Sequence, residues 1–253
     1  ADAFRSRGLD TVLLDARDFI ITDEKFTRAQ PLEAITYQNV NACVGPVIAG
    51  GRVPIIQGYI GSTRGGATTT LGFEGSDYTA ALVGAALAAE DIQVWKDVSG
   101  LMTADPAVVA GARTVKTASF AEAAELTFFG AKVLHPSAIQ PARQKNIPVH
   151  IFNSRKPESV GTAITTSAQA GANLIKSIAY KRSLCILNVL SNRSFSAYDF
   201  LKAVFDILDR ERLTPYIMST AEANAAVALS ASENLESLIA DLSHFGEVRI
   251  LRE

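Results

Sequence analysis

Short apolar segments alternate with helical patterns along the first two-thirds of the chain. The apolar segments predict strands that are buried on both faces, and they lie at Thr11–Leu14, Val53–Gln57, Gln93–Lys96 and Val149–Phe152. The helical patterns lie between them, at Asn41–Ala49, Thr79–Glu90, Ser119–Phe129 and Pro136–Lys145. Ser119 and Glu122 have the spacing of a capping box at a helix start. This alternation predicts a layered α/β domain with a largely parallel sheet.

The pattern changes after Gly161, where small and polar residues at 165–173 are typical of a linker. The order that follows is strand, helix, strand, strand, helix, strand, at Leu184–Leu190, Tyr198–Arg210, Leu213–Ser219, Ala225–Ser230, Leu235–Ser243 and Glu247–Leu251. That order predicts a ferredoxin-like α+β module. Ile175–Tyr180 predicts one more strand just before it. We therefore expect one domain at residues 1–166 and a second at residues 167–253.

Composition and charge exclude several classes of protein. The 253 residues are 48% hydrophobic and 20% charged, which suits a chain that buries a core. The formal net charge of -2 offers no basic field for nucleic acid. The longest nearly apolar run, Tyr78–Ala89, is shorter than the roughly 20 residues of a membrane span. Cys43 and Cys185 are far apart, and no signal peptide is evident. We expect a cytoplasmic protein with free thiols and with neither a nucleic-acid nor a membrane partner.

The densest candidate for chemistry is the segment Gly58–Asp77, which holds six glycines and several serines and threonines between a strand and a helix. Glycine lets the backbone approach a ligand, and hydroxyl groups donate hydrogen bonds to anionic oxygens. The helix start near Ser76 adds free N–H groups that favour phosphate. The segment lacks the Gly-Lys-Ser/Thr of a Walker P-loop. A long surface hairpin is the alternative interpretation.

Two further segments are candidates. Trp95–Pro106 follows a strand, at the sheet edge where open α/β sheets bind ligands, although it also suits an ordinary turn. Phe128–Pro136 contains Lys132, which on its own would be a solvated charge. The three histidines, His135, His150 and His244, lack metal-ligand spacing, so we assign no protein ligand to a metal.

Together, the order and spacing of these segments resemble the nucleotide half of the amino-acid kinase superfamily, and of aspartate kinase in particular. The resemblance rests on Gly75-Ser76-Asp77, on Asp97 through Pro106 and on Phe129–Pro136. It implies transfer of the ATP γ-phosphate to the side-chain carboxylate of L-aspartate, giving 4-phospho-L-aspartate for lysine, threonine and methionine biosynthesis. It also implies that Mg²⁺ bridges the phosphate oxygens.

The resemblance assigns roles residue by residue. Substrate would be bound by Tyr59, Ser76 and Asp77, and nucleotide by Lys96, Asp97, Met102 and Lys132. Asp77 and Lys132 would be the catalytic residues, since the charge of Lys132 would offset negative charge that develops on the phosphates.

Three positions depart from the family pattern. Phe73 stands where many relatives have the arginine that grips the substrate α-carboxylate, and Arg64 or Arg113 is a candidate to compensate. Met102 replaces a tyrosine, and Ala107 replaces an arginine. The family's N-terminal phosphate loop is missing, so we expect the chain to begin inside a larger protein and to be inactive alone.

The C-terminal module resembles an ACT domain, a sensor that binds amino acids. The resemblance assigns effector contacts to Asn192, Ser194, Ser196, Phe200, Leu201, Ser219, Thr220 and Glu222. Lysine and threonine are candidate effectors, although Tyr216 stands where lysine-sensing relatives have aspartate. In the family two ACT repeats are interleaved, and here the first would be complete and the second largely missing.

The same module predicts a homo-oligomer. Leu184–Leu190 is an apolar strand that we expect at the sheet edge, where strands tend to pair. Val189, Ile217 and Val227 suggest apolar patches for a second copy. We expect a homodimer through Leu184–Glu253.

Two other functions stay open. One is a non-catalytic regulatory subunit, and the other is an amino-acid kinase with another acceptor, which Phe73 favours.

Overall fold

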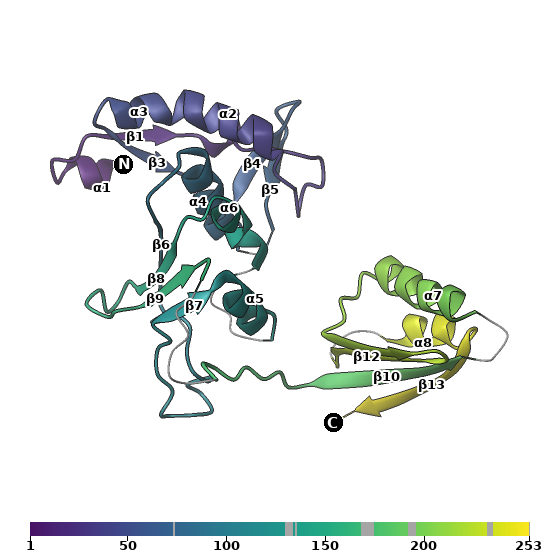
Figure 1. The fold of residues 1–253 in the computed structure, drawn as a ribbon. Coiled ribbons are helices and arrows are strands. Elements are labelled where there is room, and N and C mark those ends of the chain that lie inside the picture. Colours follow the sequence, from purple (N-terminus) through teal and green to yellow (C-terminus); the bar gives the residue numbers. More distant parts are fainter. Residues whose placement is uncertain are drawn as a thin grey trace. The chain divides into compact units, whose positions relative to one another are not determined.

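The structure is a computed structural model of the chain, and it describes residues 1–72, 74–129, 134, 136–167, 175–191, 196–231 and 235–252. The chain divides into two compact units, Ala1–Ala179 and Tyr180–Glu253 (Figure 1). Each unit has a hydrophobic core of its own.

Three small sheets build the first unit. β1 (Thr11–Leu14) pairs with β3 (Val53–Ile56), and β2 (Ile21–Thr22) pairs with β4 (Ile60–Thr63), which pairs with β5 (Thr68–Thr70). The third sheet has the order β6 (Ile92–Lys96), β8 (Val149–Asn153), β9 (Thr162–Thr165) and β7 (Thr117–Ser119). Only the β4–β5 and β8–β9 pairs among these named strands are antiparallel. The predicted largely parallel α/β fold is therefore confirmed, and a β4–β5 hairpin occupies part of the glycine-rich segment.

The helices of this unit are α1 (Asp2–Arg5), α2 (Glu33–Cys43), α3 (Gly45–Ala49), α4 (Gly75–Ala86), α5 (Phe120–Phe128) and α6 (Gln140–Gln144), with short 3₁₀ turns at Ala16–Asp18 and Pro136–Ile139. Helix α4 packs against α2 and α6 and contributes to two cores, with Leu82 in one and Ala81 in the other. Because α4 is buried along its length, its first turn is held in a fixed position.

One prediction for the strands was wrong. They are not buried on both faces, because Leu13 in β1 is 58% exposed and Trp95 in β6 is 49% exposed. Buried and exposed residues alternate along β6, so one face of this strand reaches solvent in this chain.

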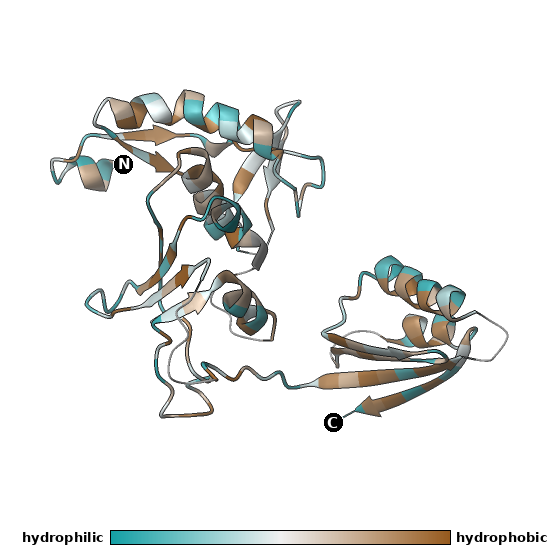
Figure 2. Cartoon of the chain, viewed as in Figure 1, coloured by the Kyte–Doolittle hydropathy of each residue, from teal (hydrophilic) through white to brown (hydrophobic). Residues whose placement is uncertain are grey.

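The second unit has the predicted ferredoxin-like order. Its elements are β10 (Leu184–Ser191), α7 (Ala197–Arg210), β11 (Ile217–Ala221), β12 (Asn224–Ser230), α8 (Glu236–Leu242) and β13 (Gly246–Arg252). The strands form one antiparallel sheet in the order β11-β12-β10-β13, and both helices cover the same face (Figure 1). Figure 2 shows hydrophobic residues along most of β10.

Two expectations for this sheet were wrong. β10 is central rather than at an edge, because in this topology the first strand lies between the third and the fourth. Val189 and Val227 are buried in the core, since they point to the face that the helices cover. Ile217 is exposed, as expected, together with Leu190 and Leu251.

The segment 175–180 is not a strand. Its contacts hold it on the first unit: Ile178 donates its N–H to the Thr103 carbonyl at 3.0 Å, and the Ser177 hydroxyl donates to the Met102 carbonyl at 2.6 Å. Lys176 pairs with Glu122 at 2.9 Å. The two compact units consequently divide after Ala179, later than the boundary expected after residue 166.

Candidate functional site

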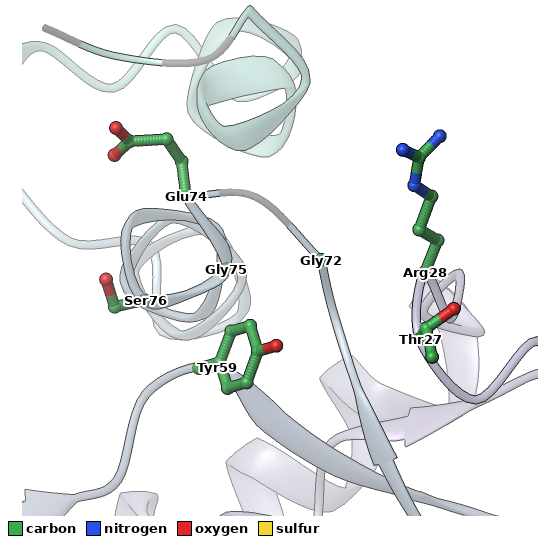
Figure 3. Close-up of a pocket in the computed structure, with 7 residues that line it drawn as sticks. All are labelled: Thr27, Arg28, Tyr59, Gly72, Glu74, Gly75 and Ser76. Atoms are coloured by element: carbon green, nitrogen blue, oxygen red, sulfur yellow. The ribbon is translucent and has the colours of Figure 1, made fainter. Parts of the chain in front are cut away.

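A cleft of about 530 Å³ opens beside the first turn of α4 (Figure 3). It is lined by Thr27, Arg28, Tyr59, Gly72, Glu74, Gly75 and Ser76. The sequence had singled out three of these residues, Tyr59, Gly75 and Ser76. It had not singled out Thr27, Arg28 or Glu74. The first turn of α4 therefore has a cavity in front of it that a small molecule can enter.

Glycine is required on both sides of this turn. A Cβ at Gly75 would lie 2.8 Å from Tyr59 Cδ2, and one at Gly58 would lie 2.8 Å from Ser76 Cβ. Tyr59 itself has a left-handed backbone with φ 78°, and its N–H donates to Thr79 Oγ1 on α4 at 3.1 Å. The close approach of the two segments holds the Tyr59 ring at the cleft.

Three charged side chains meet between the first turn of α4 and the end of β6. Lys96 Nζ lies 2.6 Å from Glu74 Oε2 and 2.8 Å from Asp77 Oδ2, and all three side chains are largely buried. Glu74 adopts φ 56° and ψ 27° as the N-cap of α4, a left-handed conformation that costs a non-glycine residue on the order of 1 kcal/mol. Its carboxylate pairs with Lys96 instead of capping the helix. We call Glu74, Asp77 and Lys96 the charged cluster.

The charged cluster shifts the titration of its members. Burial raises the pKa of Asp77 to about 6, and the nearby Glu74 adds to the rise while Lys96 opposes it. Burial alone would lower the pKa of Lys96, but hydrogen bonds to Asp77 and Glu74 raise it. Asp77 thus titrates close to neutral pH, as functional carboxyl groups often do, and Lys96 stays charged.

Helix α4 thus meets the end of β6 through Asp77 and Lys96, two residues that were singled out from the sequence. Glu74 is the member that sequence reasoning missed. Nothing in the sequence signalled it, because a glutamate in a glycine-rich segment has the pattern of a solvated loop residue.

The turn after β6 is firmly held. The Lys96 carbonyl accepts hydrogen bonds from the Ser154 N–H at 2.7 Å and the Ser154 hydroxyl at 2.8 Å. Gly100 is required, since a Cβ there would lie 2.3 Å from Thr162 Oγ1. Asp97 is exposed and Met102 is half-buried. Both remain accessible at the strand end.

Several predicted residues lie outside the described residues, namely Phe73, Lys132, His135, Asn192 and Ser194. Among the residues that are described, no group of three or more His, Cys, Asp or Glu side chains could hold a metal ion. No helix in this part of the chain is long and apolar enough to cross a membrane.

The residues of the second unit that the resemblance assigns to effector binding differ in their exposure. Ser219, Thr220 and Glu222 are exposed on β11 and the turn after it. Ser196 caps α7, where its Oγ accepts the Asp199 N–H at 3.2 Å. Leu201 is half-buried.

Phe200 differs from the other residues assigned to the effector. Its side chain is fully buried in the core between helices and sheet, so the side chain itself is shielded from an effector. The apolar face of α7 turns it inward, away from solvent.

Known proteins with similar sequences identify the family of this chain. The model of the amino acid kinase family matches residues 1–153. The chain is 38% identical over 244 residues to aspartokinase 3, chloroplastic, of Arabidopsis thaliana, covering 92% of this chain and 44% of that protein. It is 36% identical to lysine-sensitive aspartokinase 3 of Escherichia coli, covering 98% of this chain and 57% of that protein.

Solved structures give the same result. Escherichia coli aspartokinase III in complex with aspartate and ADP superimposes with a TM-score of 0.84 at 35% identity, covering 98% of this chain and 57% of that chain. The complex of the same enzyme with lysine and aspartate gives a TM-score of 0.80 at 35% identity, covering 98% and 56%. The chain spans about half the length of the curated relatives that it matches first. With the family model matched over more than half of its residues, this chain belongs to the amino acid kinase family.

Proposed function

We propose that this chain is the nucleotide half and the first regulatory module of an aspartate kinase. The observation that carries the proposal is the charged cluster, where the Asp77 carboxylate and Lys96 join the substrate-side helix to the nucleotide-side strand. The resemblance of both motifs to the family, and the similarity to an enzyme solved with aspartate and ADP, support it.

In the proposed reaction a side-chain carboxylate oxygen of L-aspartate forms a bond to the γ-phosphorus of ATP. The bond from that phosphorus to the β–γ bridging oxygen breaks, and ADP leaves. Both reactants are anionic, so positioning and charge neutralisation carry the catalysis.

Residues of this chain have distinct proposed roles. Tyr59, Ser76 and Asp77 orient the amino acid at the first turn of α4. Lys96, Asp97 and Met102 hold the nucleotide at the end of β6. Lys132 neutralises phosphate charge. Mg²⁺, when bound, would supply further neutralisation at the phosphates, which are its main ligands in kinases.

We propose that the second unit is an ACT regulatory module that binds an amino-acid effector. Its βαββαβ sheet and the similarity to an enzyme solved with lysine support this. Lysine is the first effector to test and threonine the second, with contacts from Ser196, Ser219, Thr220 and Glu222.

We also propose homodimerisation through residues 184–253. The exposed face of the sheet, with Ile186, Leu190, Ile217 and Leu251, offers apolar area to a second copy. A stable interface buries at least about 1,000 Å². Light scattering of the complete protein, with and without effector, should give a dimer, and a monomer at every effector concentration would refute this part.

The reaction is tested on the complete protein that carries this chain. ADP release is measured with L-aspartate and, separately, with L-glutamate. We expect turnover with aspartate and a loss on the order of 100-fold or more in Asp77→Asn. Turnover with glutamate alone would favour another acceptor, and turnover with neither would favour a regulatory subunit.

A further inference from the structure

The cleft beside α4 needs a cation if it is to take an amino-acid substrate. The family resemblance places that cation at position 73, where this chain has phenylalanine. Neither of the two candidates for compensation lines the cleft. Arg64 is exposed in the β4–β5 turn, and Arg113 lies beside Thr103, to whose Oγ1 it donates its backbone N–H at 3.0 Å.

Arg28 meets the requirement. It is the only cation among the described residues that line the cleft, and it lies across from Tyr59 and Glu74 (Figure 3). Its side chain is exposed, and within the described residues no ion pair or hydrogen bond engages its guanidinium. Its charge is therefore available to a ligand.

The loop that carries Arg28 is firmly positioned. The next residue, Ala29, is fully buried, and its N–H donates to the Thr70 carbonyl on β5 at 2.9 Å. The Asp23 carboxylate accepts the N–H groups of Lys25 at 3.2 Å and Gln30 at 2.9 Å, on either side of Arg28. A site on a rigid support loses less entropy when it binds a ligand.

Gly72, which follows β5, lies close to the Arg28 side chain. It has φ 81°, and a Cβ there would lie 3.4 Å from Arg28 Cγ. A side chain at position 72 would therefore crowd the Arg28 stem, and glycine leaves room for it.

We infer that Arg28 binds the α-carboxylate of the amino-acid substrate, an inference that rests on the proposed function. A guanidinium binds a carboxylate through two parallel hydrogen bonds, so the two groups match in both charge and geometry. The cleft thus offers a cation to the α-carboxylate, and the side-chain carboxylate of the substrate is left for phosphorylation.

The test compares two ligands that differ only at the α-carboxyl group, L-aspartate and its α-amide, L-isoasparagine. Binding of each to the complete protein is measured by calorimetry for wild type, Arg28→Ala and Arg28→Lys. Arg64→Ala is the matched control, since Arg64 is also exposed but does not line the cleft.

We expect wild type to prefer aspartate. Arg28→Ala should weaken aspartate binding about 10- to 100-fold, as loss of a charged hydrogen-bond pair implies, and should leave isoasparagine binding unchanged. Arg28→Lys should be intermediate, and Arg64→Ala should match wild type. An aspartate preference that survives in Arg28→Ala would overturn the inference, as would a wild-type protein without that preference.

Turnover separates this inference from the proposed function. If wild type phosphorylates aspartate and Arg28→Ala keeps its KM and its preference, the inference fails while the function stands. If binding depends on Arg28 but no phosphate is transferred, the function fails while the inference stands.

Discussion

The first turn of α4 and the core of the second unit are built on opposite principles. The turn carries the buried carboxylates of Glu74 and Asp77, which pair with Lys96 at the end of β6. Tyr59 and Glu74 have left-handed backbones beside it. The core of the second unit consists of apolar side chains from every strand and both helices. Buried charge and backbone strain lower stability and are typical of functional sites, whereas a uniform apolar core serves stability. The first turn of α4 therefore has the features of a site, whereas the core of the second unit has the features of a stabilising core.

The largest effect should come from the apolar core. Phe200→Ala removes a fully buried ring and should lower the free energy of unfolding of the second unit by about 3 to 5 kcal/mol. Phe205→Ala, on the same helix but 51% exposed, should cost less than about 1 kcal/mol. Amide hydrogen exchange can assign the loss to residues 180–253. Equal effects of the two substitutions would contradict the described core.

A substitution in the charged cluster should have the next largest effect on stability. Lys96→Met leaves two buried carboxylates without their cation and should cost about 2 to 4 kcal/mol. The control is Lys202→Met, because Lys202 pairs with Asp206 on the surface and its loss should cost under about 0.5 kcal/mol. Chemical denaturation of both variants measures the difference. A small loss in Lys96→Met would mean that the cluster is solvated.

The change in stability with pH that Asp77 causes should be smaller than the effect of Lys96→Met. The pKa of Asp77 is about 6 in the folded protein against an ordinary 3.8, so the folded state holds this proton more tightly than the unfolded state. Its contribution favours folding at low pH and is lost as pH rises through about 6. Relative to Asp77→Asn, wild type should lose about 2 kcal/mol between about pH 4 and pH 7. A constant difference between the two proteins would place the pKa of Asp77 at its ordinary value.

Loss of a helix cap should lower stability by the same amount in both units. Ser119 Oγ accepts the Glu122 N–H at 3.1 Å in a complete capping box, and Ser196 Oγ accepts the Asp199 N–H at 3.2 Å. Alanine at either position should cost about 1 kcal/mol, because capping is a local interaction. Thermal unfolding measures both. A much larger cost at Ser196 would show that it has tertiary contacts as well.

Local patterns predicted the elements that local physics determines. Thr11–Leu14 is a strand with the expected bounds, and the capping box at Ser119 is present. The order of elements in the second unit could also be predicted, from the hydrophobic periodicity and the turn residues. Which strands lie at the sheet edges could not be predicted, because it depends on pairing between segments that are distant in sequence.

The site was predicted in part for the same reason. Asp77 and Lys96 lay in motifs with recognisable spacing, so their meeting could be expected. Glu74 and Arg28 belong to no recognisable motif. Their placement at the cleft depends on a left-handed backbone at Glu74 and on a loop from another part of the chain. Ile175–Tyr180 looked like a strand, but its hydrogen bonds go to the turn at Met102 and Thr103 rather than to a sheet.

The most direct test of the account is the identity of the phosphorylated product. The complete protein is incubated with ATP, L-aspartate and hydroxylamine, which converts an acyl phosphate into a stable hydroxamate that mass spectrometry and NMR can assign to one carboxyl group. The expected product is the side-chain hydroxamate of aspartate, formed at a rate that Asp77→Asn lowers on the order of 100-fold. A hydroxamate at the α-carboxyl group, or none from aspartate under conditions where the protein hydrolyses or transfers ATP phosphate elsewhere, would contradict it.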